Sequence, residues 1–373
     1  MQREIGRYCC MKELRHALPN VPRIKASLIK LIICEKTFSE NIKPSDPVVP
    51  EFNHEPSLEI FKKDILDSKI PELDTNEKVD EFIYKLRGIC VRFFMNKNYI
   101  FGKKDKPGKK YKNERYEEDD SKLKSYLDDD EKNYIFECSK IKNGKIIYKS
   151  FKTIIPREIC DSLKHNIVSD DDFKNVIFAV WLRYISLSNW DDMYQIRINS
   201  YLYKIFRDDF NIKLELCASP FNFQFPLYCS LFYDTDKHFQ SMGSYIDIIK
   251  NRNITGLIEI NPPYIEMIQT DIINKMHMEM ELENRKFGCV FFMANWQNSP
   301  SVNTASKSKY LRKKFIPGEM TEKEANFIFD FYSDQDAKHY QVGKKTCLFI
   351  LMNDLLWKDY GDEKLKKICE KFR

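Results

Sequence analysis

The chain has 373 residues, of which 43% are hydrophobic, 14% aromatic and 31% charged. This composition supplies enough apolar surface for a sizeable core, and it excludes wholesale disorder, a membrane protein and a low-complexity scaffold. The formal net charge is only +5, from 61 basic and 56 acidic side chains. A surface that binds nucleic acid would therefore have to arise from local clustering of basic residues.

The first 95 residues are predicted to be mostly helical, with Asp74 and Thr75 as candidate N-caps of a helix that extends to Cys90. A basic segment with interleaved aromatic residues follows, and then an acidic segment. Cations alternating with aromatic rings are typical of a track for single-stranded RNA, and an exposed loop is the alternative. The basic residues of this segment are Lys97, Lys103, Lys104, Lys106, Lys109, Lys110, Lys112 and Arg115.

A β-hairpin is predicted from Tyr134 to Cys138 and from Lys145 to Phe151, because Asn143-Gly144 between them supplies a tight turn. We assign residues 1–190 to a mainly helical domain that contains the basic loop and this hairpin. The helical segments predicted after the hairpin begin at Pro156 and cover Phe173 to Leu187 and Trp190 to Phe206.

From Lys213 onward, short apolar strands alternate with helices, which predicts an α/β fold for residues 191–373. The strand Leu257 to Ile260 ends abruptly at two prolines, and a helix is predicted from Ile265 to Leu282. The other predicted strands are Leu214 to Cys217, Gly243 to Ile249, Phe287 to Met293 and Cys347 to Met352.

The most specific motif is Asn261-Pro262-Pro263-Tyr264, which directly follows an apolar strand. In an open α/β sheet, ligands bind where the strands end at their carboxyl edge. Two prolines have no N–H to donate and cannot continue a strand, so they leave carbonyl groups exposed in a rigid turn. A proline-rich strand exit with an asparagine cap is the purely structural alternative.

This motif suits the methylation of an exocyclic amine of a nucleobase, whose lone pair is delocalised into the ring. The Asn261 side-chain oxygen and the Pro262 carbonyl would accept the N–H hydrogens and turn the lone pair toward a sulfonium methyl group. The Tyr264 ring would stack on the base. Alignment and stabilisation of the developing positive charge suffice without an ionisable base. The tetrapeptide is the signature of amino-directed S-adenosylmethionine methyltransferases.

The tetrapeptide is part of an ordered series that extends roughly from Trp190 to Tyr360. The series resembles the family of the phosphorylated-CTD-interacting factor, the cap-specific adenosine N6-methyltransferases. The resemblance implies a Rossmann-like S-adenosylmethionine methyltransferase domain, preceded by a mainly helical domain that helps to bind the cap. The other members of the series are Glu215–Asn222, Phe232–Asp236, Gly243-Ser244, Asn295-Trp296, His339-Tyr340 and Thr346–Phe349.

The resemblance implies S-adenosylmethionine as cofactor. The substrate it implies is a capped mRNA whose first nucleotide is an adenosine, usually 2′-O-methylated, which becomes methylated at N6. It assigns catalysis to Asn261, Pro262, Pro263 and Tyr264, where Tyr264 replaces the Phe of cellular members and keeps a stacking face.

Cofactor binding is assigned to the loop Ala218, Ser219, Pro220 and Asn222, and to Asp234, Asp236, Gly243 and Asp247. The loop has no glycine-rich fingerprint, and the aspartates are acceptors suited to a ribose diol or an amino group. Each aspartate has a solvated loop position as its alternative. The candidate substrate contacts are Trp296, Lys309, Arg312, Lys313, His339 and Tyr340. For Trp296 the alternative is a core anchor, and for the basic residues it is a solvated surface.

Cellular members of the family also carry a WW module that binds the phosphorylated polymerase tail. The four tryptophans of this chain, at 181, 190, 296 and 357, include no pair at WW spacing. We therefore expect that the module is absent and that the polymerase tail is not bound. A chain without this module, with the composition of an AT-rich genome, suits a large DNA virus or a protist.

The 11 cysteines contain no C-x-x-C pair, and the six histidines supply no metal-ligand spacing, so no metal site is expected. The N-terminus is charged, and no apolar stretch is long enough to span a membrane. We expect an intracellular protein of the cytoplasm, or of a viral factory if the source is a virus, with the nucleus as the alternative.

Two other functions remain open at the level of sequence. The tetrapeptide does not specify the polymer, so N6-adenine methylation of DNA or of internal RNA sites is one alternative. A catalytically inactive methyltransferase-like module that binds RNA or a partner protein is the other.

Overall fold

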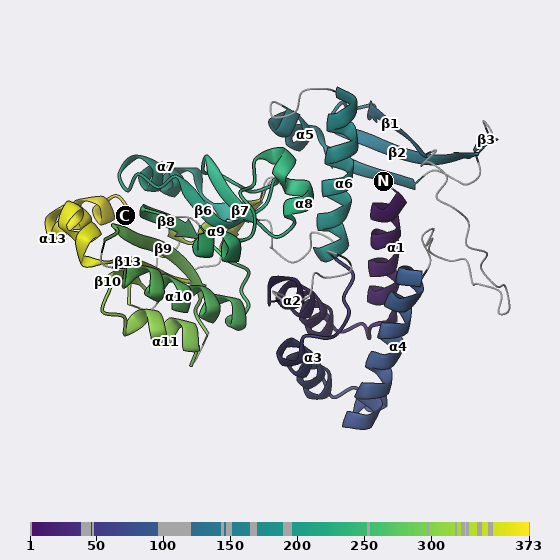
Figure 1. Ribbon diagram of the computed structural model, residues 1–373, viewed down its shortest axis with the longest axis horizontal. Helices are drawn as coiled ribbons and strands as arrows, with labels where there is room; N and C mark the ends of the chain where they lie inside the picture. The colour runs from purple at the N-terminus through teal and green to yellow at the C-terminus, as the bar shows by residue number, and fades with distance from the viewer. Residues whose placement is uncertain are drawn as a thin grey trace. The chain divides into compact units, whose positions relative to one another are not determined.

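The computed structural model of the chain divides into two compact units, unit 1 (Met1–Asp192) and unit 2 (Met193–Arg373), which Figure 1 shows in purple to teal and in teal to yellow. The structure describes residues 2–38, 46, 48–95, 121–142, 145–146, 151–164, 170–188, 196–251, 254–282, 284–296, 298–317, 319–321, 325, 328–333, 338–341 and 346–372.

Unit 1 begins with helices that pack through their apolar faces. Along α2, buried side chains recur at helical spacing, for example at Ile24, Leu28 and Leu31. Helix α1 packs against α4 and α6, and α2 packs against α3. The Thr75 hydroxyl accepts the N–H of Lys78 at 3.3 Å at the start of α4, as the N-cap prediction requires. The helices are α1 (Gln2–Ala17), α2 (Pro22–Phe38), α3 (Glu55–Asp67), η1 (Pro71–Leu73), α4 (Asn76–Met95), α5 (Arg157–Lys164) and α6 (Asp170–Ser188).

A four-stranded antiparallel sheet completes unit 1. Strand β2 (Asn133–Lys142) pairs with β1 (Ser121–Leu127), with β3 (Lys145–Ile146) and with β4 (Phe151–Pro156). The predicted hairpin is present as the pair β2–β3, although its turn at 143–144 lies outside the described residues, as does the basic segment from 97 to 115. The sequence did not predict β1, and unit 1 combines helices before and after this sheet with more strands than the expected hairpin.

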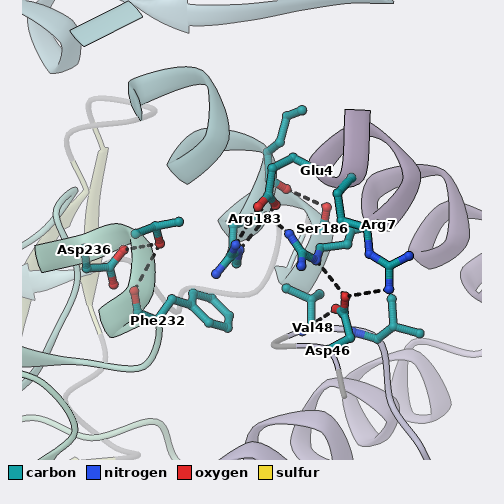
Figure 2. A network of polar contacts seen from close by, with 12 residues as sticks. Glu4, Arg7, Asp46, Val48, Arg183, Ser186, Phe232 and Asp236 are labelled. Atoms are coloured by element: carbon teal, nitrogen blue, oxygen red, sulfur yellow. Dashed lines mark hydrogen bonds and ion pairs between the residues drawn. The ribbon is translucent and has the colours of Figure 1, made fainter. Parts of the chain in front are cut away.

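Figure 2 shows a network of polar contacts that includes charged side chains of unit 1, among them the buried Glu4, Asp46 and Arg183. Asp46 is fully buried and accepts hydrogen bonds from Arg7 Nε at 2.8 Å and from the backbone N–H groups of Val48 and Val49, each at 3.0 Å. Glu4 forms ion pairs with Arg7 and with Arg183, which is 2% exposed. Each of these buried carboxylates is therefore matched by at least one guanidinium group.

Unit 2 is built on a six-stranded mixed sheet in the order β10-β13-β9-β8-β6-β7. The strands β7, β6, β8 and β9 are parallel, and β13 is antiparallel to both β9 and β10. A smaller antiparallel sheet has the order β12-β11-β5. The strands are β5 (Arg197–Ile198), β6 (Leu214–Ala218), β7 (Leu227–Ser230), β8 (Gly256–Ile260), β9 (Phe287–Ala294), β10 (Leu311–Phe315), β11 (Asp330–Ser333), β12 (Lys338–Gln341) and β13 (Thr346–Met352).

Helices lie on both faces of the large sheet (Figure 1). Side chains of α7 and α13 form one core with inward-facing residues of β8, β9 and β13, such as Leu257, Phe292 and Ile350. Helix α10 packs on β9 and on α11 and contributes no residue to that core, so it covers the other face. The helices are α7 (Ser200–Asp208), α8 (Tyr233–Asp236), η2 (Lys237–Phe239), α9 (Tyr245–Asn251), α10 (Glu266–Met280), α11 (Pro300–Ser306) and α13 (Asp354–Glu370).

Two predictions for unit 2 are wrong. The expected strand Gly243 to Ile249 is largely helix α9, and the second strand of the sheet is β7, which the sequence did not predict. In α9, Tyr245, Ile246 and Ile248 are buried while Asp247 is exposed, a helical pattern that the β-branched residues concealed. The expected helix Trp190 to Phe206 is also interrupted, since the short strand β5 precedes α7.

No helix in the described part of the chain is long and apolar enough to cross a membrane. Among the same residues, no group of three or more His, Cys, Asp or Glu side chains is arranged to hold a metal ion.

Candidate active site

The carboxyl ends of the parallel strands lie together at one edge of the large sheet, which we call the carboxyl edge. Strand β6 has β7 on one side and β8 on the other, so the winding of the chain reverses between β6 and β8. Open α/β sheets bind ligands at such a switch point. The antiparallel strand β13 begins at this edge, where Thr346 pairs with Ala294 at the end of β9.

The tetrapeptide occupies the switch point. Asn261 follows β8 directly, Pro262 is buried, and α10 begins two residues after Tyr264. The Pro263 carbonyl accepts the N–H of Ile265 at 2.7 Å, which closes the turn. Neither the Asn261 side chain nor the Pro262 carbonyl has a hydrogen-bond partner among the residues that the structure describes. Two acceptors next to each other at the end of β8 are therefore open to a ligand.

Tyr264 is held in place by the last strand of the sheet. Its hydroxyl and the Thr346 hydroxyl lie 2.7 Å apart, in a hydrogen bond whose donor either group can be. Burial raises the pKa of the Tyr264 phenol above its ordinary value, so the O–H stays protonated and available for this bond. The sequence predicted a stacking role for the Tyr264 ring, but it gave no sign of the contact with Thr346.

The loop after β6 is a tight turn that satisfies its own polar groups. The Asn222 side-chain oxygen accepts the N–H of Ser219 at 2.7 Å, and the Ser219 hydroxyl accepts the N–H of Phe221 at 3.1 Å. The Asn222 amide nitrogen donates to the Ile196 carbonyl at 3.3 Å. These predicted cofactor residues, with Ala218 at the end of β6, therefore lie at the carboxyl edge, but hydrogen bonds within the loop already engage the side chains of Ser219 and Asn222.

Glu215 in β6 fixes this loop and was not among the predicted site residues. Its carboxyl accepts the backbone N–H groups of Gln224 and Phe225, the latter at 3.0 Å. The Gln224 side chain continues the connection by donating to the Ile198 carbonyl in β5 at 3.0 Å. Burial raises the pKa of Glu215 to about 8, against the opposing effect of the two backbone hydrogen bonds. An acidic residue inside an apolar strand is the signal that would have identified it.

The other predicted cofactor residues follow β7: Asp234 and Asp236 in α8, Gly243 before α9, and Asp247 in α9. Asp236 is fully buried and accepts the Thr235 hydroxyl at 3.0 Å, so its side chain serves the local fold. Asp234 and Asp247 are exposed. Gly243 has a φ of 116°, a conformation that favours glycine over any residue with a Cβ.

Trp296 follows β9 at the carboxyl edge, with 39% of its surface exposed. The segment after it is anchored by Glu266 of α10, another residue that the sequence did not single out. The Glu266 carboxylate accepts the Ser299 hydroxyl and the N–H of Ser301, each at 2.7 Å. An exposed indole on an anchored segment offers a flat apolar face next to the tetrapeptide strand.

The structure does not bring Lys309 and Arg312 to the tetrapeptide. Arg312, in the edge strand β10, donates to the Met352 carbonyl at 3.1 Å and forms an ion pair of 2.6 Å with Asp354. Both partners lie at the end of β13 opposite to its first residue, about 20 Å away at the usual rise per strand residue. Lys309 precedes this end of β10, and Lys313 is exposed in the middle of the strand.

His339 and Tyr340 belong to β12, where they pair with Tyr332 and Phe331 of β11. Strand β11 in turn pairs with β5, whose Ile198 carbonyl holds the loop after β6 through Gln224. Their backbone is therefore connected to the carboxyl edge, while their side chains lie outside the described part of the structure.

Residues 153–326 match the sequence model of a family described as the phosphorylated CTD interacting factor 1 WW domain. The matched segment, just under half of the chain, holds both the turn after β6 and the tetrapeptide. The chain resembles the phosphorylated CTD interacting factor 1 family.

Curated relatives agree with this similarity. A human protein named mRNA (2′-O-methyladenosine-N(6)-)-methyltransferase is 24% identical over 200 residues, which are 51% of this chain and 28% of the human protein. The mouse protein of the same name is 22% identical over 221 residues, 56% of this chain and 31% of its own length. The chain thus matches less than a third of the length of these two relatives.

The family match corrects one expectation. The description of the matching family names a WW domain, which conflicts with the expectation that a WW module is absent. The match runs from β4 into the segment after β10, across helices and parallel strands. The spacing of the tryptophans is therefore not sufficient to decide whether the chain matches this family description. We withdraw that expectation, and with it the expectation that the polymerase tail is not bound.

Proposed function

We propose that unit 2 is a Rossmann-like, S-adenosylmethionine-dependent methyltransferase domain. Its proposed reaction is methylation of N6 of the 2′-O-methylated or unmodified adenosine next to the 7-methylguanosine cap of mRNA. The observation that carries the proposal is the position of Asn261–Tyr264 at the switch point, with the Asn261 side chain and the Pro262 carbonyl without partners among the described residues. The names of the two mammalian relatives support the choice of substrate.

The strand order supports a methyltransferase domain. The strands β7, β6, β8 and β9 are parallel, and the last strand in the sequence, β13, is inserted antiparallel between β9 and β10. This arrangement is typical of Rossmann-like S-adenosylmethionine methyltransferases, and it places the end of β6 beside the end of β8. A cofactor held after β6 and a base held after β8 would therefore meet at one edge.

The residues present fit the cofactor. The rigid turn Ala218–Asn222 at the end of β6 lies at the same edge as the open acceptors at the end of β8. The backbone of this turn and the Pro220 ring would hold the nucleoside part of S-adenosylmethionine. Asp234 and Asp247 are exposed carboxylates after β7 that suit a ribose diol or an amino group. When bound, S-adenosylmethionine supplies an electrophilic methyl group.

The amine is oriented by acceptors of this chain. The Asn261 side-chain oxygen and the Pro262 carbonyl each accept one N–H of the exocyclic amine, which directs the lone pair away from the ring plane. As the nitrogen gains positive charge, the same two oxygens stabilise it, and they are already in place before the reaction. The buried Pro262 and the closed turn at Pro263 keep these acceptors from moving. The proton that the amine must finally lose passes to solvent.

The base itself is held by aromatic faces. The hydrogen bond between Tyr264 and Thr346 holds the hydroxyl end of the Tyr264 ring in position, and the adenine stacks against this ring. Trp296, half-exposed after β9, is proposed to stack on a second base or on the cap. Contact with these aromatic rings keeps the adenine separated from the neighbouring bases of the RNA while its amine is bound.

The test of this function is methyl transfer by Asn261→Ala. We expect the rate on capped RNA that begins with adenosine to fall by at least about a hundredfold, because one acceptor of the developing charge is lost. Binding of S-adenosylmethionine, measured by calorimetry, should remain. Asn303→Ala is the matched control, since Asn303 is an exposed residue of α11 and the change should leave the rate unaltered.

The polymer is tested with four RNAs and nucleoside analysis of the product: cap-adenosine with and without 2′-O-methylation, cap-guanosine, and uncapped adenosine. We expect N6-methyladenosine only from the two capped adenosine substrates. Equal rates on capped and uncapped RNA would contradict cap dependence, and retained turnover by Asn261→Ala would contradict the mechanism.

A further inference from the structure

Two glutamates lie side by side in the centre of the large sheet, beneath the switch point. Glu215 of β6 and Glu259 of β8 are direct partners in the parallel register. They are 5% and 3% exposed, respectively. Adjacent parallel strands direct partnered side chains to the same face, so the two carboxyl groups share one environment. Buried pairs of acids are uncommon because burial removes the hydration of each carboxylate and two carboxylates repel each other.

The two acids differ in their partners. Glu215 accepts two backbone N–H groups, as described above. The Glu259 carboxyl makes no hydrogen bond within the described part of the chain. The enclosed side-chain atoms without a partner there belong to Gln269, His277 and Arg285, so the small exposed area of Glu259 includes its carboxyl oxygens. The Glu259 carboxyl is thus nearly buried, with a small exposed area and no hydrogen-bond partner among the described residues.

The surroundings of the pair contain few charges. From β6, Cys217 faces both acids, and from β7 Tyr228 faces Glu215. From the loop after β8, Tyr264 faces Glu259. The cation that acts on the pair among these neighbours is Arg197 of β5, which acts on Glu215. On the same face of the sheet, Leu257 of β8 belongs to an apolar core that includes side chains of α7, α13, β5 and β11.

These surroundings favour the neutral form of both acids. Burial raises the pKa of Glu259 well above its ordinary value, and the neighbouring Glu215 raises it further. An apolar pair at this position would be more stable than two buried acids, so their presence points to a use at the site. A positive charge brought to the carboxyl edge would reverse the balance and make the ionised form of Glu259 favourable.

The proposed function brings such a charge to this place. A methyl group that is passed to an amine held at Asn261 must be presented next to Asn261, which follows Glu259 by only two residues, about 7 Å along the strand direction. The methyl donor carries a sulfonium cation there, whereas the product of transfer carries a neutral thioether. The rest of the two molecules is identical, including the amino acid end.

We propose that Glu259, supported by Glu215, is the residue by which the site distinguishes the cationic methyl donor from its neutral product. The proposal rests on the function proposed above. In the absence of a cation, Glu259 holds a proton on its carboxyl oxygen. When the sulfonium binds, the O–H bond breaks, the proton passes to bulk solvent, and the carboxylate that remains attracts the cation. After methyl transfer the neutral thioether has no such attraction, and Glu259 regains a proton from solvent, which favours release of the product.

The test is a calorimetric titration of the whole chain with S-adenosylmethionine and with S-adenosylhomocysteine, in two buffers that differ in ionisation enthalpy, between pH 6.5 and 8.5. We expect the cationic ligand to release up to about one proton and the neutral ligand to release none. Because binding releases a proton, the affinity for the cationic ligand rises with pH, by up to about tenfold per pH unit. The affinity for the neutral ligand is flat over the same range. Sinefungin, which carries an ammonium group in place of the sulfonium, should behave like the cationic ligand.

The variant Glu259→Gln should lose the proton release and lower the ratio of the two affinities by about tenfold, with little change for S-adenosylhomocysteine. Glu281→Gln is the matched control, because Glu281 is an exposed acid after α10 that pairs with Lys309. Equal proton release for both ligands, or an unchanged affinity ratio in Glu259→Gln, would overturn the proposal. If the variant does not fold, the comparison of ligands in the unmodified protein decides alone. If neither ligand binds, the proposed function fails, whereas binding of both without a difference in protons contradicts only the role of Glu259.

Discussion

The two units of the chain bury charged side chains in opposite ways. In unit 1, Asp46 and Glu4 are each matched by guanidinium groups of Arg7 or Arg183 (Figure 2). In unit 2, Glu215 and Glu259 are neighbours of the same sign, and Glu259 has no hydrogen-bond partner in the described part of the structure. A matched network needs nothing from outside the fold, whereas an unmatched acid acquires a favourable environment only when a ligand arrives. A buried charged group therefore indicates a functional site only where it has no oppositely charged or hydrogen-bonding partner in the fold.

The largest effect is expected from breaking the matched network with Asp46→Ala. The change leaves Arg7 and the N–H groups of Val48 and Val49 without their acceptor in a buried place. We expect the free energy of unfolding to fall by about 3 to 5 kcal/mol, measured by denaturant unfolding. Asp130→Ala, which removes one partner of an exposed pair with Lys132, should cause no measurable change. A small effect of Asp46→Ala would remove the contrast between the units.

An intermediate effect is expected from pH. Folded Glu215 keeps its proton up to about pH 8, because burial raises its pKa from 4.5, whereas the unfolded chain releases it near the ordinary value. The folded state thus binds more protons between these limits, and the free energy of unfolding falls as pH rises, by up to about 1.4 kcal/mol per pH unit. Glu215→Gln should reduce this slope and leave the part that Glu259 contributes in the same direction, since an amide oxygen still accepts the N–H of Phe225. An equal slope in both proteins, measured at pH 5.5, 7 and 8.5, would contradict the prediction.

The smallest effect is expected from Arg312→Ala, which tests a matched cation inside unit 2. Arg312 is bound to the Met352 carbonyl and to Asp354, and its guanidinium lies 5.1 Å from the ring centre of Trp357. We expect a loss of about 1 to 2 kcal/mol in the free energy of unfolding, with an affinity for capped RNA that stays within about twofold. Lys313→Ala, at an exposed position of the same strand, should change neither quantity. Weaker RNA binding without loss of stability would restore Arg312 as a substrate contact.

The sequence was sufficient where the local pattern matched the final environment. Mostly apolar strands, such as β8 and β9, were predicted because they are buried on both faces. The tetrapeptide was predicted as a strand exit, and it is one. The segment at Tyr245 failed because β-branched residues favour a strand while their spacing fits a helix, and only packing on β7 decides between the two.

The candidate site was predictable only in the parts that are contiguous in sequence. The partnership of Tyr264 with Thr346 and that of Glu215 with Glu259 depend on which strands become neighbours, which no local pattern contains. Arg312 was wrongly expected to contact the substrate, because it is a basic residue that lies in the sequence between two site motifs. The direction of β10 and β13 instead places it at the far end of the sheet.

The hydrogen bond between Tyr264 and Thr346 joins residues that are 82 positions apart. At the usual rate of synthesis, a ribosome needs about 4 to 16 s to add that length of chain. Strand β9, all of whose residues are buried in the finished sheet, is complete 52 residues before β13 begins, so for about 3 to 10 s of this interval it has no neighbour on the side that β13 will occupy. Strand β10 is already made but joins the sheet only through β13. The nascent chain therefore carries an open apolar edge beside an unfinished tetrapeptide, and a single late strand closes both.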